Sequence, residues 1–130
     1  MAIIYDKVAK KSPQDKSVKY YASIKTIKQV DDKEVARLIA DETTLNPKEA
    51  EMAIAQFEKV LLYLLKNGYS VKMGDWASFS VSASSEGVER PEDVTASLIK
   101  KLNVNCRFST SFKESINKAE FVPASKFQND

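Results

Sequence analysis

Apolar and polar residues alternate with different periods along this chain, and each period predicts one kind of element. Between residues 3 and 28 the period is two, which predicts strands at residues 3–10 and 18–28 around a loop at residues 12–15. From residue 31 to residue 66 apolar positions recur three and four residues apart, which predicts two helices. Beyond Gly68 the period of two returns. The pattern therefore predicts an α+β chain with an N-terminal β-hairpin.

The first helix is expected to begin at Asp31 or Asp32, where Glu34 completes an acidic capping box by reaching back to the helix start. It is expected to end near residues 43–44. Three apolar residues then share one face at helical spacing: Val35, Leu38 and Ile39.

The second helix has the clearest start in the sequence. Asn46 is the expected N-cap, Pro47 takes the first helical position, where its missing N–H costs nothing, and Glu49 closes a capping box. The helix is expected to run to Lys66 and to stop at Asn67 and Gly68, because glycine supplies the left-handed C-terminal conformation.

This second helix is apolar over an arc wider than the roughly 100° that a surface helix needs. The arc contains Ala50, Ala53, Ile54, Phe57, Val60, Leu61, Leu64 and Leu65, with Leu62 and Tyr63 beside them. One face is expected to pack on the first helix and the sheet, and the other on a partner chain. The alternative is a monomer in which the N-terminal hairpin covers the second face.

The second half of the chain predicts a sheet with a polar interruption. Strands are expected at residues 69–73 and 76–81 around a turn at Gly74-Asp75, and again at residues 102–108. Residues 82–93 are predicted to be a polar break, and residues 94–101 fit either a short helix or the start of the returning strand. Cys106 is expected to be buried on that strand. A capping pattern at Ser111 predicts a last helix to about residue 119, followed by a frayed tail from residue 121.

The composition argues against an enzyme or a metal site. Histidine is absent and Cys106 is the single cysteine, so the usual general base and the usual zinc ligands are missing. Acidic pairs such as Asp31-Asp32 lie where helix caps are expected. We expect no catalytic residue, no metal, no cofactor and no membrane span, and a reducing cytoplasmic location.

Charge is distributed unevenly. Residues 1–30 hold seven lysines against Asp6 and Asp15, a net charge of +5, whereas the whole chain has a net charge of +2. This asymmetry predicts an anionic partner for the N-terminal segment. The alternative is a solvated strand surface, in which lysine protects an exposed edge from aggregation.

The order of predicted elements, together with Asn67-Gly68, Val71-Lys72-Met73 and the segment from Gly74 to Val81, resembles the bacterial HU and integration-host-factor family. That last segment is similar to the family's Gly-Phe-Gly-Thr-Phe strand turn. The resemblance covers about residues 31–119. The additional residues 1–30, with the segments 84–89 and 95–97, resemble the N-terminally extended HU-like branch of Bacteroides-type bacteria.

The resemblance implies an intertwined homodimer, with a helical hairpin packed under a β-sheet. Two β-arms are then expected to wrap the minor groove of double-stranded DNA, each with a proline wedge near its tip. Lysine and arginine contacts to phosphates are expected to dominate, with little base reading, as suits a nucleoid protein. The expected divisions are an extension at residues 1–30, an HU-like domain at residues 31–121 and a flexible tail at residues 122–130.

The arm departs from the family pattern, because residues 84–93 carry four carboxylates against Arg90. Pro91 occupies the place of a wedge, yet it also suits the first position of a helical turn before Glu92-Asp93. The DNA-binding candidates are Lys72, Arg90, Pro91, Lys100, Lys101, Arg107 and Lys113. The candidates for the dimer interface or core are Phe57, Leu61, Leu64, Leu65, Trp76 and Phe79. Trp76 is expected to pack at the sheet or interface rather than to stack on bases.

Two functions remain open from the sequence. The first is DNA binding through backbone contacts with low sequence specificity. The second is a dimeric structural or protein-interaction module with the same fold, which has lost DNA bending because its arm is acidic.

Overall fold

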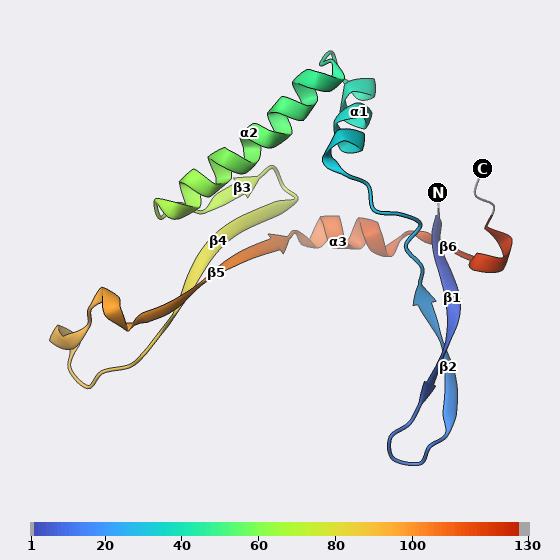
Figure 1. Cartoon of the computed structure of the whole chain (residues 1–130), viewed down its shortest axis with the longest axis horizontal. Coiled ribbons are helices and arrows are strands. Elements are labelled where there is room, and N and C mark those ends of the chain that lie inside the picture. The colour runs from blue at the N-terminus through green and yellow to red at the C-terminus, as the bar shows by residue number, and fades with distance from the viewer. Residues whose placement is uncertain (1, 128–130) are drawn as a thin grey trace. The chain divides into compact units, whose positions relative to one another are not determined.

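The computed structural model describes residues 2–127, and its elements form two compact units (Figure 1). One unit comprises Asp32–Lys113. The other consists of the described parts of Met1–Asp31 and Glu114–Asp130. The chain is mixed α+β, as the hydrophobic pattern predicted.

Two helices open the larger unit, α1 at Asp32–Glu42 and α2 at Pro47–Lys66. The predicted start of α2 is confirmed: the Glu49 N–H donates to Asn46 Oδ1 at 2.8 Å, and the Asn46 N–H donates to Glu49 Oε1 at 3.2 Å. Pro47 lies in the first turn. The helix stops before Gly68, whose φ of +86° lies in the left-handed region that glycine adopts without strain.

An antiparallel sheet follows, with the order β3 (Val71–Met73), β4 (Ala77–Ser85) and β5 (Ile99–Phe108). The turn between β3 and β4 holds Gly74, with a φ of +51°, then Asp75 and Trp76. The Trp76 N–H donates to the Met73 carbonyl at 3.2 Å. The prediction that Trp76 belongs to the second strand is therefore wrong, because this hydrogen bond makes the turn one residue longer.

The arm is longer than the sequence predicted. Strand β4 continues through Ser85, so the expected polar break at residues 82–85 is wrong, because these serines form cross-strand pairs with β5. A bulge between Ser84 and Ser85 ends the regular pairing. Two short 3-10 turns follow, η1 at Pro91–Asp93 and η2 at Ala96–Leu98, so residues 94–101 contain both a helical turn and the start of the returning strand.

Helix α3 spans Thr110–Asn117. Its cap is Ser109, because the Phe112 N–H donates to Ser109 Oγ at 3.1 Å. The predicted cap at Ser111 is wrong by two residues. A run of serine and threonine offers several possible caps, and the sequence does not show which hydroxyl meets a free N–H.

The smaller unit is built on a second sheet, with the order β2 (Val18–Ile24), β1 (Ala2–Lys11) and β6 (Glu120–Pro123). The predicted hairpin is confirmed, and within the described chain its strand β1 also pairs with β6. The strand predicted over residues 18–28 is wrong beyond Ile24, because Ile24 opposite Tyr5 is the last cross-strand pair. Strand β6 runs parallel to β1 and precedes the 3-10 turn η3 at Ala124–Lys126. The prediction of a frayed tail is therefore wrong for residues 121–126, and residues 128–130 lie outside the description.

Few side chains are buried within one chain. Among the described residues, the buried hydrophobic ones are Ile4, Ala36, Ala50 and Ala77. The apolar face of β5 was expected to be buried, yet Leu102 is 64% exposed, Val104 is 71% exposed and Cys106 is exposed. The burial predicted for Cys106 is thus wrong in the single chain, because alternation identifies the apolar face of a strand but not what covers it.

Candidate nucleic-acid interface

One face of the β3-β4-β5 sheet is entirely polar. Side chains alternate between the two faces of a strand, so the register places nine residues on this face. None of the nine carries a carboxylate: they are Lys72 on β3, then Ser78, Ser80, Ser82 and Ser84 on β4, then Lys101, Asn103, Asn105 and Arg107 on β5. We call this set the polar face. Its functional groups donate hydrogen bonds and carry only positive charge.

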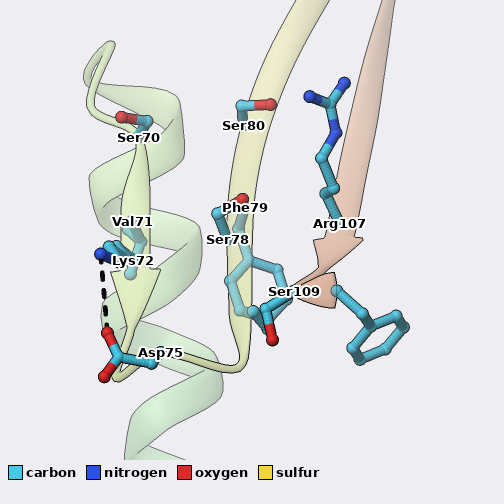
Figure 2. Close-up of a pocket in the computed structure, with 11 residues that line it drawn as sticks. Ser70, Val71, Lys72, Asp75, Ser78, Phe79, Ser80, Arg107 and Ser109 are labelled. Carbon is cyan, nitrogen blue, oxygen red and sulfur yellow. Dashed lines mark ion pairs between the residues drawn. The ribbon is translucent and has the colours of Figure 1, made fainter. Parts of the chain in front are cut away.

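Two cations flank a serine at the base of the polar face. Ser78 is the cross-strand partner of Lys72 on one side and of Arg107 on the other. A shallow hollow of about 360 Å³ is lined by these three residues together with Ser80 and Asp75 (Figure 2). Lys72 Nζ lies 3.8 Å from Asp75 Oδ1, in an exposed pair that contributes little. Within the described residues no carboxylate lies within 4.0 Å of Arg107.

The polar face extends up the arm. Ser82 is paired with Asn103, and the Asn105 amide donates to Ser82 Oγ at 3.1 Å. Ser84 is paired with Lys101 near the bulge. Sequence reasoning missed these serines and asparagines as site residues. Serine occupies every second position from Ser78 to Ser84, which indicates one face of a strand, but residues 82–84 were assigned to the polar break.

The remaining charged candidates lie elsewhere. Lys100 falls at the bulge, opposite no residue of β4, and its Nζ lies 3.8 Å from Glu86 Oε1. Arg90 Nε lies 3.2 Å from Asp93 Oδ2, so two arm cations are paired with arm carboxylates. Pro91 lies in the first turn of η1, as its alternative interpretation predicted. Lys113 lies on α3. The structure therefore brings Lys72 and Arg107 together, with Lys101 on the same face.

The apolar candidates stabilise the other face of this sheet. Phe57 of α2 meets Phe79 of β4 edge to face, with 6.3 Å between ring centroids. Leu61, Leu64 and Leu65 are half-buried on the same helix. Trp76 stacks on Phe108 at 6.4 Å and lies 6.0 Å from Phe112. These contacts connect helices and sheet within one chain, while leaving Trp76 43% exposed.

The polar face offers hydrogen-bond donors. No cluster of three His, Cys, Asp or Glu residues suitable for a metal is found among them. In the same part of the chain, no helix has the length and apolar character needed to cross a bilayer. Ammonium, guanidinium and hydroxyl groups on one face of a sheet suit an extended anion, because each donates hydrogen bonds to phosphate oxygens without reading a particular base.

Comparison with known proteins agrees with this geometry. The profile of a family described as "HU domain fused to wHTH, Ig, or Glycine-rich motif" matches residues 1–123. No curated protein matches the chain. A candidate bacterial DNA binding protein from Bacteroides vulgatus ATCC 8482 has a similar structure, with a TM-score of 0.57 and 15% identity over 94% of this chain and 48% of that one. This chain thus spans about half the length of that protein.

HU from Anabaena, crystallised with DNA, is also similar. The TM-score is 0.50 and the identity 14%, over 68% of this chain and 99% of that chain. At these identities the two structural likenesses establish the fold and nothing finer.

Proposed function

This chain belongs to the family of HU domains fused to wHTH, Ig or glycine-rich motifs, and we propose that it binds double-stranded DNA as a homodimeric, HU-like architectural protein. It contacts mainly the phosphate backbone, with low sequence specificity, in the bacterial nucleoid. The HU-like domain covers residues 31–121, with residues 1–30 as an extension. No catalytic activity is part of this proposal.

The polar face is the observation that carries the proposal. Lys72, Lys101 and Arg107 supply positive charge, and four serines supply small hydroxyl donors that let a phosphate backbone approach closely. Hydroxyl and ammonium donors make sequence-independent contacts, whereas base reading needs several side chains aimed at base edges. Asn105, one of the two amides on this face, already donates to Ser82. Backbone binding therefore follows from the chemistry of the face.

The uncovered apolar surface supports the proposed dimer. Val104 and Leu102 on the sheet, and Leu38 on α1, are each at least half exposed in the single chain. Apolar side chains gathered on one sheet face and on the helices are typical of a surface that meets a partner. A second copy of the chain supplies that partner by symmetry and doubles the number of cations that face the duplex.

The proposal is tested by fluorescence anisotropy of a labelled duplex across a salt series. The three polar-face cations on each of two chains alone predict a slope of log affinity against log salt of at least about −5, since each phosphate contact contributes roughly 0.9. Affinity should then fall about a thousandfold between roughly 50 and 200 mM salt. Absence of binding at low salt would refute the proposal and favour a protein-interaction module.

The acidic arm tip makes a separate prediction. Glu89 and Glu92 carry negative charge near the tip and form none of the ion pairs recorded among the described residues. We expect Glu89→Gln/Glu92→Gln to raise duplex affinity about fivefold at low salt, because each carboxylate near a phosphate costs on the order of 1 kcal/mol before screening. The gain should vanish at high salt.

The matched control is Glu42→Gln/Glu58→Gln, which removes the same charge from the two helices. Measured at about 0.1 M salt, it should leave affinity within about twofold of the wild type, since charges beyond about 10 Å are largely screened there. An arm variant with unchanged affinity at every salt concentration would mean that the arm tip lies more than a screening length from the duplex.

A further inference from the structure

Like charges face each other at the end of the N-terminal hairpin. The register of β1 and β2 places Lys10 directly opposite Lys19, with Val8 opposite Tyr21 as the next pair on the same face. Side chains in such pairs have their Cβ atoms roughly 5 Å apart, and like charges at this separation destabilise a hairpin. Lys11 is the next residue along β1. The fold therefore concentrates lysines that repel one another.

No carboxylate neutralises these lysines within the described residues, where none lies within 4.0 Å of Lys10, Lys11 or Lys19. Asp15, the acidic residue of the loop, accepts hydrogen bonds from the Ser17 N–H at 3.0 Å and from Ser17 Oγ at 2.8 Å. These bonds lower the pKa of Asp15, so it stays ionised while it closes the loop. The single carboxylate beside the three lysines, that of Asp15, is therefore already hydrogen-bonded to Ser17.

The lysines surround a hollow rather than projecting separately. A depression of about 360 Å³ is lined by Lys10, Lys11 and Lys19, by the hydroxyl residues Ser12 and Ser17, and by Asp15 and Tyr21. Lys10 Nζ lies 5.5 Å from the centre of the Tyr21 ring, a contact that holds the ammonium group over the aromatic face. The hollow offers ammonium and hydroxyl donors at one place, which is the donor set that phosphate oxygens bind.

We propose that this hollow is a second phosphodiester-binding site, which holds the backbone of the same duplex that occupies the polar face. This inference rests on the proposed function. The seven residues 25–31 join β2 to α1 without a helix or strand before Asp32 and include Lys25 and Lys28. A duplex bound at the polar face is therefore present at high effective concentration for the hairpin, and a second weak contact adds strongly to affinity.

The acidic arm of a second copy is the competing occupant, and the ion pairs of the arm argue against it. Glu86 lies 3.8 Å from Lys100, and Asp93 lies 3.2 Å from Arg90, so half of the arm's four carboxylates already face a cation. A phosphodiester backbone offers a repeating unpaired negative charge instead. The hollow is lined by no Arg, Asn or Gln, the side chains that most often read a base through two hydrogen bonds, and its Asp15 carboxylate is engaged with Ser17.

The test is Lys10→Gln/Lys19→Gln in the full chain, measured by duplex anisotropy across a salt series. The salt slope should become shallower by about 0.9 for each lysine removed, and affinity at low salt should fall about tenfold or more. Lys10→Arg/Lys19→Arg keeps the charge and should retain the wild-type salt slope. Lys33→Gln/Lys59→Gln removes the same charge from the helices and should leave the slope unchanged. Circular dichroism should show that the Gln variant stays folded, because the substitution relieves a repulsion.

The outcomes separate this inference from the proposed function. If the hairpin variant binds like the wild type while loss of polar-face cations weakens binding, the hairpin site is refuted and the function stands. If the wild type itself does not bind a duplex, both are refuted. If duplex binding is unchanged but sedimentation shows weaker self-association of the hairpin variant, the acidic arm is the occupant and the inference fails.

Discussion

Replacing Val104 with aspartate is expected to prevent dimerisation and, with it, stable folding. Val104 is 71% exposed in the single chain, lies on the apolar face of β5 and is the cross-strand partner of Val81, which is 38% exposed. Covering a valine by a partner contributes about 1.5 kcal/mol or more, and placing an unpaired carboxylate there costs several kcal/mol. In a symmetric dimer both chains lose this free energy of association, so the dimer dissociation constant should rise at least about a thousandfold.

The measurement is sedimentation together with thermal unfolding at several protein concentrations. Wild-type unfolding temperature should rise with concentration, because dimerisation stabilises the folded chain by mass action. Asn105→Asp is the matched control, since it places the same charge on the neighbouring residue of the polar face. It should remain dimeric and folded while binding DNA more weakly. A Val104→Asp chain that stays dimeric would show that this face is not the interface.

The sequence predicted the elements that depend on local chemistry. Asn46, Pro47, Glu49 and Gly68 determine the ends of α2 through hydrogen bonds within a few residues and through one left-handed backbone conformation. Such signals need no knowledge of the rest of the fold. The prediction of α2 was therefore confirmed to the residue, whereas the loop between β1 and β2 is two residues longer than the predicted residues 12–15, because β2 begins at Val18.

The elements that were missed depend on distant partners. Ser82–Ser85 form a strand because β5 returns alongside them, and Phe121–Pro123 form a strand because β1 offers a free edge. Neither segment has a β pattern strong enough to indicate a strand alone, since one is rich in serine and the other is very short. Sheet pairing between residues more than a hundred positions apart is invisible to a pattern read over a few residues.

The candidate site likewise has one part that the sequence predicts and one part that depends on strand pairing. Individual cations such as Lys72, Lys101 and Arg107 could be selected from the sequence, but their shared face follows only from the register of three strands. Arg90 and Lys100 were equally plausible candidates from the sequence, but Arg90 lies outside the strands and Lys100 falls at the bulge, opposite no residue of β4. The expected burial of Cys106 was wrong in the single chain, because alternation identifies the apolar face of a strand but not what covers it. Charge in the sequence identifies candidates, and the register of the strands decides which of them share one face.

Removing the three cations of the polar face should produce the largest loss of DNA affinity. In Lys72→Gln/Lys101→Gln/Arg107→Gln, a dimer loses six positive charges from one continuous surface. Each lost phosphate contact makes the salt slope shallower by about 0.9, so the slope should decrease by about 5 and affinity at low salt should fall at least about a hundredfold. Anisotropy of a labelled duplex measures both quantities in one titration series.

Two matched variants decide whether that loss reflects the site or merely the net charge. Lys33→Gln/Lys48→Gln/Lys59→Gln removes as many charges from the helices and should bind DNA with nearly the wild-type slope. Lys72→Arg/Lys101→Arg/Arg107→Lys keeps every charge in place and should retain most of the affinity, because backbone contacts depend on charge more than on side-chain shape. Equal losses in the helix and polar-face variants would mean that the chain attracts DNA through its overall charge. A loss confined to the polar-face glutamine variant identifies the β3-β4-β5 sheet as the surface that holds the duplex.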